Sequence, residues 1–324
     1  MTWSWNSRPR ASVRPTLQDE TLRDGIQSAS AFDPAIGEKI ELLHSMDGLG
    51  IGVVNVGLPA ASARNRADSE ALCDEIVRSK LRIRPAAAGR TVVSDLVPIV
   101  ELSQRAGVPV AIYTFIGSSA IRALAEDWSV ERIVRQSAEA IRFGVREGLE
   151  VCYVTEDTSR ARPEVLATLY ENALACGAKR LCVADTVGSA TPDGVRALVG
   201  FTRSIIAANG YSDIGIDWHG HNDRGLVLMN ALAALDAGAD RLHACALGIG
   251  ERSGNAPMEL LLLNLDLADE IPVDRARLAD YCALAARALH WTVPPNHPLI
   301  GGRSPGPLSR PATADAATTS GLAR

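Results

Sequence analysis

The stretch DIGIDWHGH, residues 213–221, is a short apolar run that ends in two histidines. A run of this length between turn residues predicts a buried β-strand. Side chains at positions i and i+2 of a strand point to the same side, so His219 and His221 face one space. The pattern predicts a strand that brings two imidazoles to one site, although a simple hydrogen-bonded pair at a strand end is the alternative.

Seven further runs of this kind occur along the chain, and longer stretches separate them. Residues 129–147 show the pattern expected of those stretches, because their apolar side chains fall on one helical face. Eight strands that alternate with helices predict an α/β fold of the (β/α)₈ or TIM-barrel type. The eight predicted strands are 14–20, 50–57, 81–88, 108–116, 149–155, 179–185, 213–221 and 241–248.

The alternation weakens after about residue 268, which predicts a barrel domain over 14–268. Residues 269–324 are expected to form a short helical extension and a flexible tail rich in Gly, Pro, Ser, Ala and Thr. A doubly wound sheet is the competing fold, and it requires a glycine-rich loop after the first strand. Here polar residues DETLRDG (19–25) follow that strand, whereas the glycine-rich GIGERSG (248–254) follows the eighth.

Composition narrows the classes of function. The chain has 324 residues, of which 47% are hydrophobic and 22% charged, so it can form a full core. A net charge of −5 without a long basic run argues against a nucleic-acid partner. None of the six cysteines forms a C-x-x-C pair, and no secretory signal or membrane span is evident. These features predict a soluble, cytoplasmic protein with no membrane partner.

A carboxylate is expected to join the two histidines. Asp19 ends the first predicted strand, and a closed barrel places that strand beside the last ones. Two imidazoles and one carboxylate make a common divalent-metal site with open positions for substrate. The predicted ligands are therefore Asp19, His219 and His221, with Asn255 after the eighth strand as a further oxygen donor.

The residues that follow Asp19 also carry chemistry. Arg23 is a fixed cation beside the predicted metal, where it would stabilise an enolate or a developing alkoxide. Asp24 is expected to anchor Arg23, and Gln27 to hydrogen-bond a bound carbonyl. An ordinary first-turn ion pair between Arg23 and Asp24 is the alternative.

Six segments together resemble one family. They occur in order at barrel spacing, and the resemblance to the DRE-TIM metallolyase superfamily covers roughly residues 16 to 268. That superfamily includes 2-isopropylmalate, citramalate, homocitrate and Re-type citrate synthases, and 3-hydroxy-3-methylglutaryl-CoA (HMG-CoA) lyase. The segments are DETLRDGIQS (19–28), GLPAAS (57–62), TEDTSR (155–160), ADTVG (184–188), HGHNDRGL (219–226) and GIGERSGN (248–255).

The resemblance implies a metal-dependent acyltransferase. A divalent ion (Mg²⁺, Mn²⁺ or Zn²⁺) would hold a 2-oxo acid, and the enolate of acetyl-CoA would attack its ketone in a Claisen-type condensation. The family motifs assign the metal to the four ligands named above. They place Arg23 beside the ketone oxygen, Thr186 on a substrate carboxylate and Glu156 in proton relay. The family also implies a homodimer.

Several positions depart from the family and indicate an altered substrate pocket. Asn55 stands where many relatives have Glu, and Tyr113 where many have His. Arg122 is expected to receive the distal anionic group of a dicarboxylic oxo acid, as its position carries Arg in homocitrate synthases. Arg90 is expected to line the same pocket. Solvated surface arginines are the alternative for both.

The C-terminal part leaves two questions open. A histidine from that region normally joins proton transfer in the long synthases, but only PPNHPLIGGRSPG (294–306), with His297, resembles the start of the segment. The acid/base partner is thus unidentified, and no regulatory domain is expected. An HMG-CoA lyase-like activity is the second hypothesis, disfavoured because the nearest thiol to the 248–255 loop is Cys245. A catalytically idle relative, kept as a partner subunit, is the third.

Overall fold

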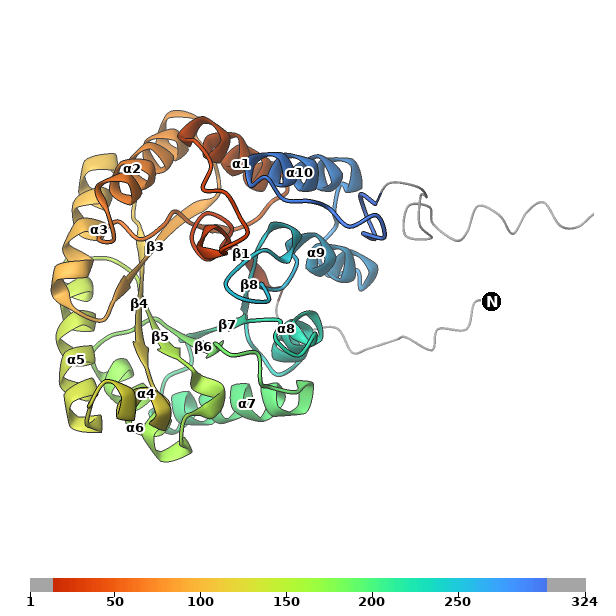
Figure 1. Cartoon of the computed structure of the whole chain (residues 1–324). Helices are drawn as coiled ribbons and strands as arrows, with labels where there is room; N and C mark the ends of the chain where they lie inside the picture. The colour runs from red at the N-terminus through yellow and green to blue at the C-terminus, as the bar shows by residue number, and fades with distance from the viewer. Residues whose placement is uncertain (1–13, 302–324) are drawn as a thin grey trace, which may run out of the picture.

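The computed structural model describes residues 14–301, which form a closed barrel of eight parallel strands inside a ring of helices (Figure 1). Each strand pairs with the next, and β1 pairs with β8 to close the barrel. The predicted (β/α)₈ fold is confirmed. The strands are β1 (Thr16–Asp19), β2 (Val53–Asn55), β3 (Arg84–Arg90), β4 (Ala111–Gly117), β5 (Val151–Glu156), β6 (Arg180–Asp185), β7 (Gly215–Gly220) and β8 (Arg241–Ala244).

The helices follow the strands in the expected alternation, and local signals explain several of their ends. Ser129 caps α5 by accepting a hydrogen bond from the backbone N–H of Arg132. Gly107 ends α3 in the left-handed conformation, which glycine adopts without steric cost. The α-helices are α1 (Ile36–Gly48), α2 (Ala63–Arg78), α3 (Val93–Ala106), α4 (Ala120–Ala125), α5 (Val130–Arg146), α6 (Pro163–Ala175), α7 (Pro192–Ala208), α8 (Val227–Asp236), α9 (Met258–Leu267) and α10 (Arg275–Ala288), and the 3₁₀ turns are η1 (Gly25–Gln27), η2 (Thr158–Arg160) and η3 (Ala246–Gly248).

Helix α10 lies within the predicted C-terminal extension and packs along α1, where it closes the helical ring (Figure 1). Arg277 Nη1 donates to the carbonyl oxygen of Gly48 at 3.2 Å, and Arg287 pairs with Glu41 at 3.2 Å. The described start of the extension is thus docked on the barrel. The expected flexible tail falls on residues 302–324, which lie outside the described part of the chain.

The interior of the barrel has an apolar half and a polar half. Strands β2 to β6 contribute small apolar side chains, among them Ala86, Ala88 and Cys182. Strands β1, β7 and β8 contribute buried polar ones. The buried polar residues that these three strands turn into the barrel are Gln18, Asp217, His219, Arg241 and His243. Across residues 14–301, no helix is both long enough and apolar enough to span a bilayer.

Candidate active site

A cavity of about 260 Å³ opens at the carboxyl ends of the strands, the face on which TIM-barrel active sites form. It lies over the barrel axis, because residues from most of the strands or the loops after them line it. The lining residues are Arg23, Asp24, Gln27, Leu58, Ala88, Tyr113, Phe115, Val154, Glu156, Cys182, Ala184, Thr186, His219, His221, His243 and Glu251.

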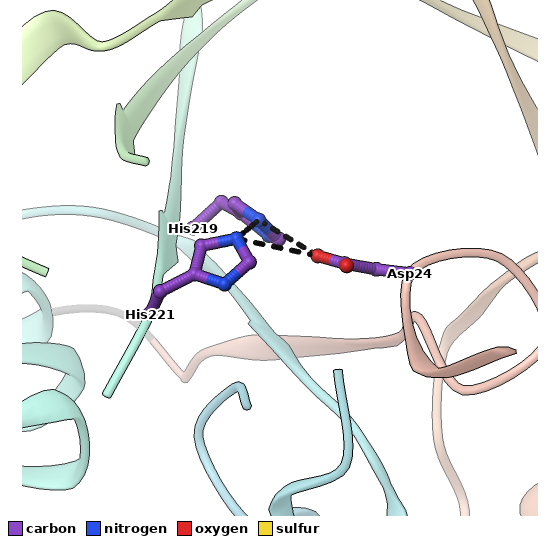
Figure 2. A group of neighbouring side chains, drawn as sticks. All are labelled: Asp24, His219 and His221. Atoms are coloured by element: carbon purple, nitrogen blue, oxygen red, sulfur yellow. Dashed lines mark hydrogen bonds and ion pairs between the residues drawn. The ribbon is translucent and has the colours of Figure 1, made fainter. Parts of the chain in front are cut away.

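Two histidines and an aspartate converge at one wall of this cavity (Figure 2). His219, in β7, and His221, just after it, place their Nε2 atoms 3.2 Å apart. Asp24 Oδ2, from the loop after β1, lies 3.2 Å from His219 Nε2 and 3.5 Å from His221 Nε2. All three residues are buried. The i, i+2 pairing expected of the strand thus brings both imidazoles to one point.

The carboxylate at this point is Asp24, which corrects the expectation for Asp19. Alternation along β1 turns Gln18 and Glu20 into the barrel, where the two side chains hydrogen-bond each other at 2.6 Å. Asp19 therefore faces the helical layer. Its Oδ2 accepts from the Tyr281 hydroxyl of α10 at 2.5 Å, and its Oδ1 accepts from the Thr21 N–H at 2.8 Å. Both oxygens of Asp19 are thus used away from the histidines.

The three side chains fit a divalent cation. Among the described residues, buried Asp24 Oδ2 has no hydrogen-bond partner. Burial would raise the pKa of Asp24, but Arg23 and the two histidines outweigh it and hold that pKa far below its usual range. Burial, together with His219, lowers the pKa of His221 to about 4. At neutral pH His221 is therefore a neutral imidazole beside a carboxylate, the protonation states that a metal site requires.

The loop after β8 braces the second histidine. His221 and Asn255 form an isolated bridge, and the backbone N–H of Asn222 donates to the carbonyl oxygen of Gly254 at 2.9 Å. A Cβ atom at Gly254 would lie 1.9 Å from the Gly248 carbonyl oxygen, so this close turn requires glycine. Asn255 itself is buried, and its amide nitrogen donates to Ile249 O at 3.3 Å. The structure thus brings Asn255 next to the cluster.

Arg23 lies beside the cluster, with its guanidinium held mainly by Glu20. Its Nε and Nη2 atoms are both 2.7 Å from Glu20 Oε2, and its Nη1 atom is 3.8 Å from Asp24 Oδ2. The structure therefore shows the expected Arg23–Asp24 neighbour contact, but the shorter pair is with Glu20. Arg23 keeps its full positive charge at the edge of the cavity, since its pKa is raised by these two carboxylates against the effect of burial.

A buried polar network inside the barrel, of which Tyr113 and His243 also line the cavity, was not expected from the sequence. Asn55 donates to Glu20 Oε2 at 3.0 Å, and His243 lies between Glu20 Oε1 at 3.5 Å and Asp217 Oδ2 at 3.0 Å. Tyr113 donates its hydroxyl proton to Asp217 Oδ2 at 2.6 Å. The predicted strands could have indicated this network, because side chains two residues apart on a strand share a face. Glu20 therefore shares a face with Gln18, and Asp217 shares one with His219.

Three other predicted residues line the cavity as expected. Gln27 ends η1, Glu156 ends β5, and Thr186 follows β6. Burial raises the pKa of Glu156, although Arg122 opposes it. The Thr186 hydroxyl accepts from the Asp157 N–H at 2.7 Å, which fixes its position at the wall.

Two predicted pocket arginines do not line the cavity. Arg90 ends β3 with its side chain 72% exposed and forms a bidentate pair with Asp95. Arg122 lies in α4 and contacts Glu126 at 3.5 Å and Glu156 at 3.6 Å. Arg90 pairs with a carboxylate outside the lining, so the surface alternative describes it. Arg122 does not line the cavity itself but contacts Glu156, which does, so an ion-pair role describes it. Tyr113, in contrast, lines the cavity as predicted.

The two residues singled out near the C-terminal side have other partners. Cys245 is completely buried, and burial holds the pKa of its thiol well above the usual range. It does not line the cavity. His297 Nε2 lies 3.1 Å from Glu259 Oε1, in a pair outside the cavity lining. Neither residue is placed to act on a molecule in the cavity.

Comparison with known families agrees with this site and fold. The family described as HMGL-like matches residues 14–284, which is most of the chain. The chain therefore belongs to the HMGL-like family, and the resemblance to the DRE-TIM metallolyases is confirmed.

The curated proteins to which the chain is similar include synthases of two kinds. The chain is 29% identical over 291 residues to the probable 2-isopropylmalate synthase of Methanopyrus kandleri, covering 89% of this chain and 55% of that one. It is 32% identical over 290 residues to the mitochondrial homocitrate synthase of Yarrowia lipolytica, covering 88% and 61%. The chain thus spans about three fifths of the length of these relatives.

Solved structures share the fold at lower identity. The HMG-CoA lyase from Brucella melitensis aligns with a TM-score of 0.70 and 18% identity, over 86% of this chain and 100% of that one. The carboxyl transferase domain of Rhizobium etli pyruvate carboxylase aligns with a TM-score of 0.66 and 17% identity, over 86% and 48%. At these identities the likeness establishes the barrel and not the activity.

Proposed function

We propose that this protein catalyses a metal-dependent Claisen-type condensation of acetyl-CoA with a 2-oxo acid. The observation that carries the proposal is the convergence of Asp24, His219 and His221 beside Arg23 in a cavity at the catalytic face of the barrel. The names of the curated relatives, synthases at about 30% identity, support this reaction class.

In the proposed mechanism Asp24, His219 and His221 would hold the metal. Asn255 is proposed as a weaker oxygen donor to the same ion. A bound divalent metal would supply Lewis acidity and orient the 2-oxo acid. Its identity as Mg²⁺, Mn²⁺ or Zn²⁺ is open, because a mixed nitrogen and oxygen ligand set accepts all three.

The other residues have roles set by their places. Arg23 provides a fixed positive charge for the oxygen on which negative charge grows, at no cost of reorientation. Thr186 and Gln27, which follow β6 and β1, offer hydrogen bonds to the bound acid from two different parts of the barrel rim. Glu156 is proposed to hold a proton during the reaction, and its raised pKa supports that role.

A thiol-release assay tests the proposal. The full chain would be loaded with Mg²⁺, Mn²⁺ or Zn²⁺ and mixed with acetyl-CoA and a panel of 2-oxo acids. We expect CoA release that requires both metal and acid, and that is lost in Asp24→Asn. Release of acetyl-CoA from a hydroxyacyl-CoA, without condensation, would instead favour the lyase. A protein that binds metal but performs neither reaction would favour the idle-partner alternative.

We further propose a cytoplasmic homodimer, from cysteine usage and family resemblance. Size-exclusion chromatography with light scattering measures the oligomer, and a monomer would contradict that part of the proposal.

A further inference from the structure

We infer that the 2-oxo acid is monocarboxylic and carries a short apolar side chain. This inference rests on the proposed function and adds the chemical class of the substrate. It follows from the two halves of the cavity. The metal cluster and Arg23 come from β7 and the loop after β1, whereas an apolar wall comes from β3 to β6 and the loop after β2. That wall consists of Leu58, Ala88, Phe115, Val154, Cys182 and Ala184.

The position of the apolar wall determines which part of the substrate it contacts. In a closed barrel of eight strands, β3 to β5 lie across the axis from β7, β8 and β1. A 2-oxo acid whose carboxylate and ketone oxygens face Asp24, His219 and Arg23 therefore points its side chain toward Ala88 and Val154. An apolar group buried there is stabilised because its surface is removed from water.

A second carboxylate on the substrate would have no cation to meet at this wall. Among the residues that the structure describes, Arg23 is the one Arg or Lys side chain in the lining. Its guanidinium is already paired with Glu20 and contacts Asp24. The lining also holds the carboxyl groups of Glu156 and Glu251, and their partners Arg122 and Arg252 lie outside the lining. A dianionic acid would thus bring a further negative charge into a cavity that carries more carboxylates than fixed cations.

The two arginines predicted to serve the substrate pocket pair with carboxylates of the protein instead. Arg90 points to solvent and pairs with Asp95, and Arg122 is shared by Glu126 and Glu156. A charge buried without a partner is strongly unfavourable. We therefore expect a preference on the order of 100-fold for monocarboxylic acids, equivalent to about 2.8 kcal/mol.

The size of the cavity limits the apolar group. The cavity has a volume of about 260 Å³. The small side chains of Ala88 and Ala184 leave room along the apolar wall, whereas the larger side chains of Phe115 and Leu58 restrict it. The geometry therefore fits a branched or linear side chain of a few carbon atoms. Phe115→Ala would enlarge this end and is expected to extend the accepted side chains to longer ones.

Two measurements on the metal-loaded full chain test the inference. The first compares kcat/KM for 2-oxobutyrate and 2-oxoisovalerate with that for oxaloacetate and 2-oxoglutarate. The second measures binding of the same acids by calorimetry without acetyl-CoA. We expect the two monocarboxylic acids to be favoured in both. If condensation occurs with a dicarboxylic acid as the best substrate, the inference is overturned and the proposed function stands.

The two failures can be separated. If no acid supports metal-dependent CoA release, the proposed function fails, and the calorimetric order of the four acids still decides the specificity of the cavity. Tighter binding of the monocarboxylic acids would support the inference, and tighter binding of the dicarboxylic acids would refute it.

A matched pair of variants adds a direct test of the charge argument. Val154→Arg places a cation in the apolar wall and is expected to shift the ratio of 2-oxoglutarate to 2-oxoisovalerate use upward by at least about tenfold, equivalent to 1.4 kcal/mol. Val154→Met, similar in length but uncharged, is the control and should leave that ratio low. Arg90→Ala should not change it, because Arg90 lies outside the lining. Equal ratios in the two Val154 variants would contradict the charge argument.

Discussion

The side chain of Arg23, which lines the cavity, forms a fixed pair with Glu20, and its Nε and Nη2 atoms are both 2.7 Å from Glu20 Oε2. Glu20 is fully buried, and Gln18 and Asn55 hold its carboxylate in turn. Burial opposes ionisation of Glu20, but Arg23 and His243 outweigh it and lower its pKa. The guanidinium is thus oriented by a charged partner that never reaches the cavity.

Glu20→Gln tests this positioning. The amide keeps the shape but loses the charge, so Arg23 is expected to shift and kcat to fall about 10- to 100-fold, the scale of losing about 1.4–2.7 kcal/mol of charge stabilisation. Metal affinity, measured by calorimetry, should change little, because Glu20 does not belong to the ligand cluster. Glu20→Asp should restore part of kcat. An unchanged kcat in Glu20→Gln would show that Arg23 needs no such partner.

The stability of the metal-free protein should depend on pH through His221. Its pKa is about 4 in the folded protein, against an ordinary value of 6.5 for a solvated histidine, so between these values the unfolded chain binds more protons. The contribution of His221 is therefore lost as pH falls from about 6.5 to about 4, up to about 3 kcal/mol.

Urea unfolding with a chelator present, at several pH values, measures this effect. The difference in free energy of unfolding between the wild type and His221→Asn separates the contribution of His221 from that of carboxylates that titrate in the same pH range. We expect the wild type to lose more free energy of unfolding than the variant across that window. Parallel curves for the two proteins would refute the lowered pKa.

The contact between Asp19 and Tyr281 ties α10 to the first strand, and its loss should affect stability and not metal binding. Tyr281→Phe removes the hydroxyl that donates to Asp19 Oδ2 and leaves a buried carboxylate oxygen without that partner. The expected cost is about 1–3 kcal/mol in the free energy of unfolding. Metal affinity should match the wild type. A large loss of metal affinity in Tyr281→Phe would instead make Asp19 part of the metal site.

The fold was predictable from the sequence because its strongest signal is repeated. Eight apolar runs with helical stretches between them leave few architectures, and polar residues after the first run argue against a doubly wound sheet. The pairing of His219 and His221 was predictable for the same reason, since a strand alternates with a period of two residues.

The choice between Asp19 and Asp24 was harder because it depends on which face of β1 Asp19 occupies and on the path of the loop that carries Asp24. Two acidic residues follow one another at the end of that strand, and a shift by one residue exchanges inside for outside. Because Gln18 points into the barrel, its neighbour Asp19 points outward. There Asp19 accepts a hydrogen bond from Tyr281, which lies 262 positions away in sequence. A contact that distant leaves no local pattern.

The arginines illustrate a second limit. Arg90 and Arg122 follow or lie near strand ends, where pocket residues occur, but their side chains are long and find carboxylates close by. Asp95, five residues after Arg90, and Glu126, four residues after Arg122, form ion pairs with these arginines. Position along a strand therefore predicted that Tyr113 lines the cavity. The place of a long arginine side chain also depends on nearby carboxylates, which the strand position does not reveal.

The central claim is that Asp24, and not Asp19, completes the metal site with His219 and His221. Calorimetric titration of Zn²⁺ or Mn²⁺ into Asp24→Asn and Asp19→Asn, each checked for folding by circular dichroism, tests it most directly. We predict that Asp24→Asn loses at least about tenfold in metal affinity, whereas Asp19→Asn stays near the wild type. Loss of affinity in Asp19→Asn with wild-type affinity in Asp24→Asn would contradict the account.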